Sequence, residues 1–131
     1  MKVLLDTHIL LWWLADDEHL PAGAAEAIAD PDTEVVVSAA SAWEISIKRA
    51  AGRLDAPEDL VNALAANDFG TFPITADHAM AAGRLPPHHA DPFDRMLIAQ
   101  AQIEGITLIS VDSRFSKYEV DLLPLAPGSR R

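Results

Sequence analysis

The chain has 131 residues, of which 50% are hydrophobic and 23% are charged, and it contains no cysteine. This is enough apolar material for one core, so residues 1–131 are predicted to form a single domain. The lack of cysteine excludes disulfide scaffolds, thiolate zinc sites and cysteine nucleophiles. Ten Lys and Arg against twenty Asp and Glu give a net charge of −10, which argues against a simple nucleic-acid-binding module.

The apolar segments of the sequence are short. The longest run, residues 9–15, is far below the roughly 20 residues that a membrane-spanning helix needs. Asp6 and His8 interrupt the N-terminal apolar stretch, which argues against a signal peptide. We therefore expect a cytoplasmic protein with no membrane partner.

In chain order, short apolar runs alternate with helical patterns. Residues 2–5 form an apolar run stopped by Asp6 and are predicted to be a buried strand. The next segment is apolar on every side, so the helix predicted at 8–15 must be buried or lie in an interface. Four further elements are predicted up to residue 67: a helix at 20–30, a strand at 34–37, a helix at 39–51 and a helix at 57–67.

The second half of the chain continues this alternation. The predicted elements are a strand at 71–74, a helix at 75–83, a helix at 91–104, a strand at 106–111 and an edge strand at 121–125. Helix 91–104 has the clearest boundaries, with Asp91 as N-cap, Pro92 in the first turn and Gly105 as stop. Apolar strands alternating with helices predict an α/β fold in which a parallel sheet carries helices on both faces.

Four carboxylates are predicted to gather at one edge of this sheet. Asp6 and Asp112 directly follow predicted strands, whereas Glu44 and Asp94 lie in the first turns of predicted helices. Functional groups of parallel sheets collect beyond the carboxyl ends of the strands. Each acid also has a structural alternative: Glu44 could complete a capping box with Ser41, and the aspartates could stabilise helix N-termini.

A cluster of these carboxylates would need a compensating cation. Two like charges 4 Å apart repel by roughly 4 kcal/mol at a surface-like dielectric. Ligand sets made only of oxygen suit Mg²⁺ or Mn²⁺, and an ion held there would activate a water for attack on phosphorus. The hydroxyls of Thr7 and Ser110 could orient a ligand or a bound water, or they could cap the local backbone.

Four sequence motifs carry a resemblance to a known family. They are Leu4-Leu5-Asp6-Thr7-His8, Ser41-Ala42-Trp43-Glu44-Ile45-Ser46-Ile47-Lys48, Asp91-Pro92-Phe93-Asp94-Arg95 with the helix that follows, and Ile109-Ser110-Val111-Asp112. These motifs occur in the order seen in PIN-domain proteins. From residue 2 to about residue 118, the chain resembles the VapC toxins of type II toxin–antitoxin systems in particular.

The resemblance implies a PIN-like fold, with a parallel sheet of four or five strands between helices. It implies an endoribonuclease that depends on Mg²⁺ or Mn²⁺, with Asp6, Glu44, Asp94 and Asp112 as catalytic residues and metal ligands. Asp112 stands at the most variable of the four positions, and Asp91 is expected to act as a cap. Such toxins are generally homodimers, are inhibited by a cognate antitoxin, and in many cases cleave tRNA or ribosomal RNA.

Polar and cationic side chains near the acids are candidates for substrate contact. The candidates are Thr7, Lys48, Arg95, Ser110 and Arg114, with Lys117 nearby. The cations could instead pair with neighbouring acids or be solvated. Arg95 could also turn away from the site as a structural ion-pair partner.

Histidines and one apolar segment carry further expectations. His88-His89 is predicted to lie in a surface loop and His8 in the first turn of a helix, while His19 and His78 show no functional pattern. Residues 10–14 are predicted to be core, with a contact to a second copy or to an antitoxin as the alternative. Residues 130–131 are expected to form a loose tail.

Two other functions remain as alternatives to the nuclease. One is a catalytically weak PIN-fold RNA-binding or regulatory module, against which the four intact acids argue. The other is a different metal-dependent phosphoryl enzyme, such as a small phosphatase or a DNA nuclease. The sequence has neither a glycine-rich phosphate loop nor the paired acidic motif that such a phosphatase would use.

Overall fold

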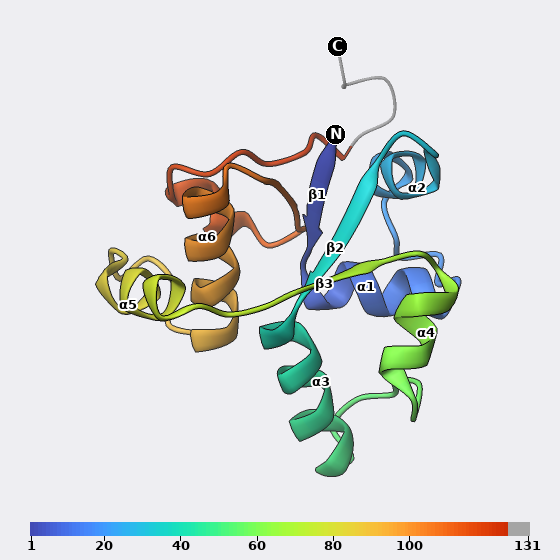
Figure 1. The fold of residues 1–131 in the computed structure, drawn as a ribbon. Coiled ribbons are helices and arrows are strands. Elements are labelled where there is room, and N and C mark those ends of the chain that lie inside the picture. The colour runs from blue at the N-terminus through green and yellow to red at the C-terminus, as the bar shows by residue number, and fades with distance from the viewer. Residues whose placement is uncertain (126–131) are drawn as a thin grey trace.

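The computed structural model describes residues 1–125 and is built around a four-stranded parallel sheet (Figure 1). The strands are β1 (Lys2–Leu5), β2 (Glu34–Ser38), β3 (Gly70–Phe72) and β4 (Thr107–Ile109), arranged in the order β3-β2-β1-β4. In the central register, Leu4 of β1 pairs with Val36 of β2 on one side and with Leu108 of β4 on the other. The predicted α/β fold with a parallel sheet is confirmed.

All six predicted helices are present, with ends that differ from the prediction by a few residues. They are α1 (Thr7–Leu14), α2 (Ala22–Ala29), α3 (Ala39–Ala50), α4 (Leu60–Ala66), α5 (Ala76–Arg84) and α6 (Pro92–Glu104), followed by the 3₁₀-helix η1 (Ser113–Lys117). The predicted boundaries of α6 are confirmed. Asp91 accepts hydrogen bonds from the backbone N–H groups of the first turn, and Gly105 ends the helix with a left-handed φ of 65°.

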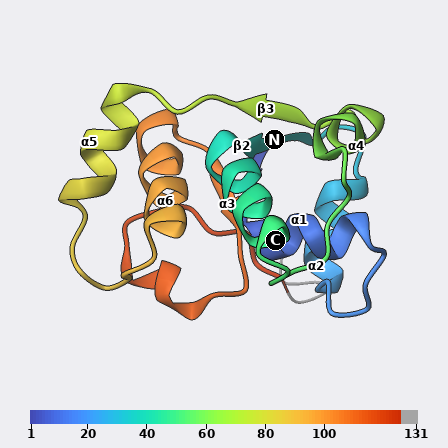
Figure 2. The same cartoon turned by 90° about the horizontal axis from the view of Figure 1, so that it is seen from below.

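Alternate side chains of each strand point to opposite faces of the sheet and form two apolar cores. Val3 and Leu5 belong to a core that includes residues of α1, α2 and α4. Leu4, between them, belongs to the second core, which is formed largely with α6. Figure 2 shows α5 and α6 together at one side of the molecule, with α1, α2 and α4 at the other. Helices therefore cover both faces, as predicted.

The strand order places one end of the sheet where a site is expected. The chain runs from β1 outward through β2 to β3 and then returns to β4 on the other side of β1. The backbone N–H of Asp6 donates to the carbonyl of Ile109 at 2.9 Å, and this hydrogen bond joins the carboxyl ends of β1 and β4. Ligand sites of open α/β sheets form at such a switch in strand order, beyond the carboxyl ends.

The predicted edge strand at 121–125 forms only one isolated bridge, between Leu122 and Leu108. Leu108 accepts from the backbone N–H of Leu123 at 3.0 Å and donates to the carbonyl of Asp121 at 2.8 Å. Pro124 has no N–H, so it cannot continue the ladder. The sheet of the described residues thus has four strands, and the predicted tail at 130–131 lies outside the described residues.

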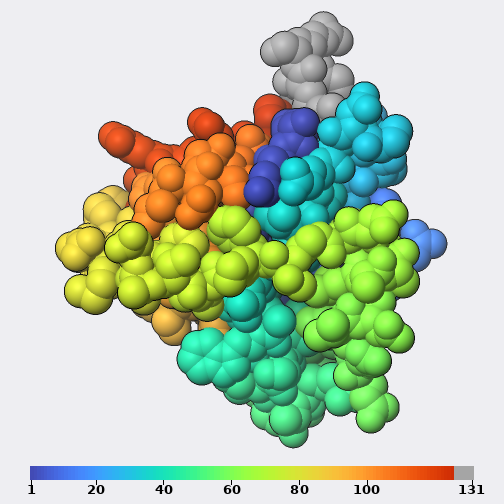
Figure 3. Space-filling view, viewed as in Figure 1, coloured from blue at the N-terminus to red at the C-terminus, as the bar shows by residue number. Residues whose placement is uncertain are grey.

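The apolar segment of α1 packs into the core, as predicted. Leu10 is fully buried, and the four residues that follow it are half-buried against the same core. In the space-filling view, the chain around β3 and α5 runs across the near face, while α3 and α4 extend below it (Figure 3). Within residues 1–125, no helix is long and apolar enough to cross a bilayer.

Candidate active site

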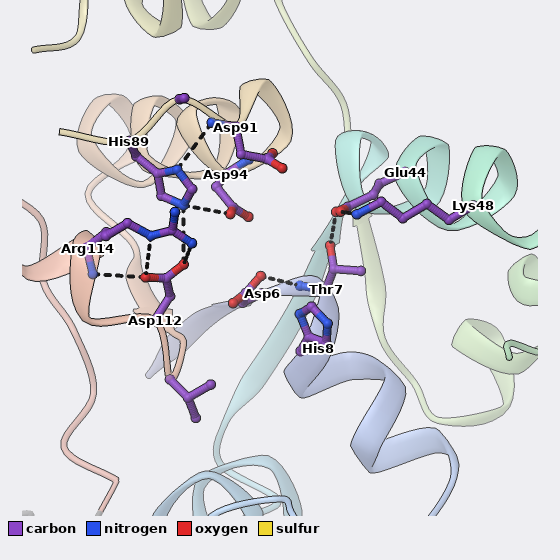
Figure 4. Close-up of a pocket in the computed structure, with 12 residues that line it drawn as sticks. Asp6, Thr7, His8, Glu44, Lys48, His89, Asp91, Asp94, Asp112 and Arg114 are labelled. Carbon is purple, nitrogen blue, oxygen red and sulfur yellow. Dashed lines mark hydrogen bonds and ion pairs between the residues drawn. The ribbon is translucent and has the colours of Figure 1, made fainter. Parts of the chain in front are cut away.

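A cavity of about 560 Å³ opens at the carboxyl ends of β1 and β4 (Figure 4). The structure brings all four predicted carboxylates to it: Asp6, Glu44, Asp94 and Asp112. The residues that line it also include Asp91, Lys48, His89 and Arg114. Residues from four separate parts of the chain therefore meet at one place.

Asp6 lies at the end of β1 and caps α1. Its Oδ1 accepts from the backbone N–H of Thr7 at 2.6 Å, and its Oδ2 accepts from the Ser110 hydroxyl at 2.7 Å. Only 5% of Asp6 is exposed. Burial is the main cause that raises the pKa of Asp6 above its usual range, although both hydrogen bonds oppose it. The hydrogen bonds from Thr7 and Ser110 therefore fix the orientation of the Asp6 carboxylate, which has little contact with solvent.

Glu44 lies in the second turn of α3, not in the first. The helix begins at Ala39 because Ser38 is its N-cap and accepts from the backbone N–H of Ala40 at 3.0 Å. The structural alternative for Glu44, a capping box with Ser41, is therefore wrong. The buried Glu44 carboxylate instead accepts from the Thr7 hydroxyl at 2.7 Å, and its other oxygen is ion-paired with Lys48.

Asp94, like Asp6, has a raised pKa. Burial, followed by the negative charges of Asp6, Asp91, Glu44 and Asp112, raises the pKa of Asp94 to about 8. The nearby cations do not offset this accumulation of negative charge at Asp94. A bound divalent cation would offset it.

Asp112 has the opposite electrostatic environment. Its two oxygens accept from the Arg114 guanidinium at 3.0 and 2.8 Å, and Oδ1 also accepts from the Arg114 backbone N–H, which caps η1. The hydrogen bonds from Arg114 lower the pKa of Asp112 to about 2. Asp112 is thus paired with a guanidinium, whereas Asp94 contacts the His89 imidazole.

His89 is a site residue that the sequence analysis missed. The predicted surface loop is correct for His88, which is exposed, but wrong for His89, of which 3% is exposed. Its Nε2 lies 2.9 Å from an oxygen of Asp94 and 3.2 Å from an oxygen of Asp112. The available signal was its position just before the N-cap Asp91, which places it at the same helix end as Asp94.

The candidates for substrate contact divide into three groups. The Thr7 hydroxyl donates a hydrogen bond to Glu44, and the Ser110 hydroxyl donates one to Asp6. Both hydroxyls therefore orient carboxylates. Lys48 and Arg114 line the cavity and also pair with acids there. Lys117 is exposed and lines a different cavity.

Arg95 does not reach the cavity. Its guanidinium donates to the backbone carbonyls of Ala82, Leu85, Pro86 and His89 at 2.8 to 3.1 Å. It therefore turns away from the site, as one alternative proposed. Its partners are backbone carbonyls of the α5–α6 connection rather than an acidic side chain.

The other histidines have separate places in the fold. His8 lies in the first turn of α1, as predicted, and its exposed side chain lines the cavity. His78 is buried, forms a capping box with Thr75 at the start of α5 and contacts Glu104 at 2.8 Å. Its role is thus in joining α5 to α6, away from the carboxylates.

The chemistry of the cavity suits a hard divalent cation. Asp6, Glu44 and Asp94 offer carboxylate oxygens, the donors that Mg²⁺ and Mn²⁺ prefer. Burial and then the neighbouring carboxylates raise the pKa of Asp94, and a divalent cation would offset that accumulation of negative charge. The residues present therefore fit the ion that the sequence predicts.

A family model for the PIN domain matches residues 3–121. The chain is 32% identical over 119 residues to Ribonuclease VapC22 of Mycobacterium tuberculosis, covering 88% of this chain and 91% of that protein. A chain of VapBC2 from Rickettsia felis, solved with a promoter DNA fragment, has a TM-score of 0.68 at 14% identity, with 93% of this chain and 97% of that chain covered. A chain of a toxin–antitoxin complex from Klebsiella pneumoniae has a TM-score of 0.63 at 18% identity, with coverages of 93% and 96%. The chain therefore belongs to the PIN-domain family, as a VapC-type member.

Proposed function

We propose that this chain is an endoribonuclease that depends on Mg²⁺ or Mn²⁺ and acts as the toxin of a type II toxin–antitoxin pair. The observation that carries the proposal is the meeting of Asp6, Glu44, Asp94 and Asp112 at one cavity whose negative charge is not fully offset. The 32% identity to Ribonuclease VapC22 supports ribonuclease chemistry.

Asp6, Glu44 and Asp94 would hold the cation, directly or through its waters, and Asp112 would complete the pocket. A bound Mg²⁺ or Mn²⁺ would lower the pKa of water and offset charge on the scissile phosphate. The protein's own contribution is orientation. The hydroxyls of Thr7 and Ser110 hold the carboxylates of Glu44 and Asp6 in fixed directions.

The cations at the rim of the cavity would bind the RNA backbone. Arg114 is half-exposed, and its guanidinium is held in place by Asp112. A guanidinium fixed in this way can meet phosphate oxygens with little loss of side-chain entropy. Lys48 would supply a second positive charge across the cavity from it (Figure 4).

We further propose a cognate antitoxin as partner, a homodimer as the working form and the cytoplasm as the location. The structurally similar chain from Klebsiella pneumoniae was solved in a toxin–antitoxin complex, which supports the first of these. Cytoplasmic tRNA or ribosomal RNA would be the substrate.

Incubation of the purified protein with total tRNA and ribosomal RNA, in Mg²⁺, Mn²⁺ or EDTA, tests the proposal. We expect discrete products that require the divalent ion and disappear in Asp6→Asn, because asparagine can still cap α1 but is a weak ligand. Cleavage that persists in EDTA or in Asp6→Asn would contradict the assignment. RNA binding without cleavage would favour the regulatory module.

A further inference from the structure

We propose that His89 is a positioning residue of the active site. Its Nε2–H donates a hydrogen bond to Asp112 and lies against an oxygen of Asp94, and it thereby holds these two carboxylates together. The inference rests on the proposed metal-dependent nuclease, whose residues it orients. It assigns a role to a side chain that belongs to none of the predicted site motifs.

The hydrogen bonds of His89 fix which ring nitrogen carries the proton. Its Nδ1 lies 3.2 Å from the backbone nitrogen of Asp91. A backbone N–H can only donate, so Nδ1 must accept with its lone pair. A neutral imidazole has a single N–H, which must then be on Nε2. That N–H donates to an oxygen of Asp112 at 3.2 Å, and Nε2 also lies 2.9 Å from an oxygen of Asp94.

A protonated Nε2 has no lone pair for a metal ion. One atom each of His89, Asp94 and Asp112 lies within 4.8 Å of the others, a spacing that would also suit three metal ligands. The backbone N–H at Nδ1 argues against that arrangement. His89 is instead a donor to carboxylates, the role that outer residues of metal sites commonly have.

The ring is held from several sides. Its own backbone N–H donates to the Tyr118 hydroxyl at 2.9 Å, and that hydroxyl donates to the carbonyl of Pro86 at 2.6 Å. Arg95 binds the His89 carbonyl at 3.1 Å, and the Phe115 ring packs against the imidazole at a centroid distance of 5.8 Å. His89 is therefore a fixed donor rather than a mobile side chain.

This donor joins two separate elements of the site. Asp94 lies in α6 and Asp112 precedes η1, and both carboxylates meet the same Nε2 (Figure 4). Without the N–H, the two carboxylates would lose this shared contact, and they would repel each other when both are ionised. The consequence would be a displaced Asp94, the carboxylate whose charge a cation must offset.

Two substitutions separate the contact made by Nδ1 from the contacts made by Nε2. His89→Asn places an amide near the position of Nδ1, so it can accept from Asp91 but cannot reach the carboxylates. His89→Gln places an amide N–H near the position of Nε2, so it can donate to them but loses the contact to Asp91. Mn²⁺ affinity by electron paramagnetic resonance, RNA cleavage and thermal unfolding are measured for both variants and the wild type.

We expect His89→Asn to weaken Mn²⁺ binding and cleavage by about 10- to 100-fold, the usual cost of losing such a partner. His89→Gln should stay within about threefold of the wild type in Mn²⁺ affinity, even where its stability is lower. If His89→Gln instead binds Mn²⁺ more weakly than His89→Asn, the ring only holds the loop through Asp91, and the inference is overturned. If His89→Asn does not fold, a folded His89→Gln with Mn²⁺ binding weakened tenfold overturns it equally.

A readout free of metal and substrate checks the tautomer. In a two-bond ¹H–¹⁵N spectrum of the protein in EDTA, His89 should show its proton on Nε2. A proton on Nδ1 would overturn the inference while leaving the nuclease proposal intact. If the wild type neither binds Mn²⁺ nor cleaves RNA, the nuclease proposal fails and the role of His89 fails with it.

Discussion

At the scale of single residues, the four acids of the site have different environments. Asp6 and Glu44 are buried and held by hydroxyl donors, and Asp112 is neutralised by Arg114. Asp94 keeps a pKa of about 8 because burial and like charges dominate around it. Burial raises the pKa of Asp6 as well, so a bound cation would favour the ionised form of both carboxylates.

The raised pKa of Asp94 predicts how stability depends on pH without metal. The unfolded pKa is near 3.8 and the folded pKa is about 8, so folding favours the protonated carboxyl. Ionised Asp94 therefore opposes folding, and stability should fall as pH rises from about 4 to 8. In EDTA, Asp94→Asn should weaken this decline and raise Tm at pH 8 by about 4 °C, equivalent to roughly 1 kcal/mol.

Thermal unfolding of both proteins across this pH range checks the prediction. Added Mg²⁺ should raise the Tm of the wild type more than that of Asp94→Asn, because the ion offsets the charge that the substitution removes. Parallel pH profiles for the two proteins would contradict the electrostatic account of Asp94.

At the scale of elements, the connection between α5 and α6 is held by Arg95. Four of the carbonyls that this guanidinium binds lie between Ala82 and His89. These bonds fix the segment that carries His89 into the site. Arg95 thus contributes to the site from outside the cavity.

Arg95→Gln should destabilise the fold by about 2–3 kcal/mol, because several carbonyls lose a charged donor at once. Arg114→Gln is the matched control: its side chain is 54% exposed, so Tm should change little. Cleavage should instead fall at least about tenfold in Arg114→Gln. Denaturant unfolding and cleavage assays measure both variants. Equal stability of the two would show that the carbonyl contacts of Arg95 contribute little.

The segment around Leu125 is packed against the N-terminal turn of α2. A Cβ at Gly23 would lie 2.3 Å from the carbonyl oxygen of Leu125, to which the Gly23 N–H donates at 2.8 Å. Gly23→Ala should therefore cost about 1–3 kcal/mol. Gly83→Ala, within α5 and with open space around its Cβ position, should stabilise by about 0.5–1 kcal/mol. Urea unfolding of the two variants tests this contrast, and changes of the same sign would contradict it.

Most helix ends could be predicted from the sequence because caps are local. Asp91 and Pro92 mark the start of α6 and Gly105 marks its end, and each signal lies at or next to the boundary that it defines. The start of α3 was correctly predicted at residue 39, but its capping residue was harder to assign, since Ser38 and Ser41 are both competent caps three residues apart, and the structure uses Ser38. The environment of His89 depends on contacts with Asp112 and Tyr118, which lie more than twenty residues away in the chain. A local pattern cannot report such contacts.

At the scale of the whole molecule, alternating strands and helices were sufficient to predict a parallel sheet and the edge at which its acids meet. The edge strand predicted at 121–125 is reduced to one bridge in the described residues, because Pro124 cannot continue the ladder and the bridge depends on β4. Because the chain carries a net charge of −10, it has few cations to bind RNA phosphates. Among the cavity-lining residues, the Lys and Arg side chains that could bind them are Lys48 and Arg114.

RNA binding should therefore depend only weakly on salt. With two or three phosphate contacts to single-stranded RNA, the slope of log K against log salt should be no steeper than about −2. Binding of Asp6→Asn, which is not expected to cleave, at several salt concentrations gives this slope. A slope of about −5 or steeper would require a basic surface beyond the cavity rim.

The central claim is that the acids at the sheet edge form a cation site and are not only helix caps. A Mn²⁺ titration followed by electron paramagnetic resonance, with the wild type, Asp6→Asn, Glu44→Gln and Asp94→Asn, tests it most directly. The asparagine and glutamine variants keep hydrogen-bonding capacity and should remain folded. The wild type should bind Mn²⁺ saturably, and each variant should bind at least about tenfold more weakly. Equal binding by all four proteins, or no saturable binding by the wild type, would contradict the cation site.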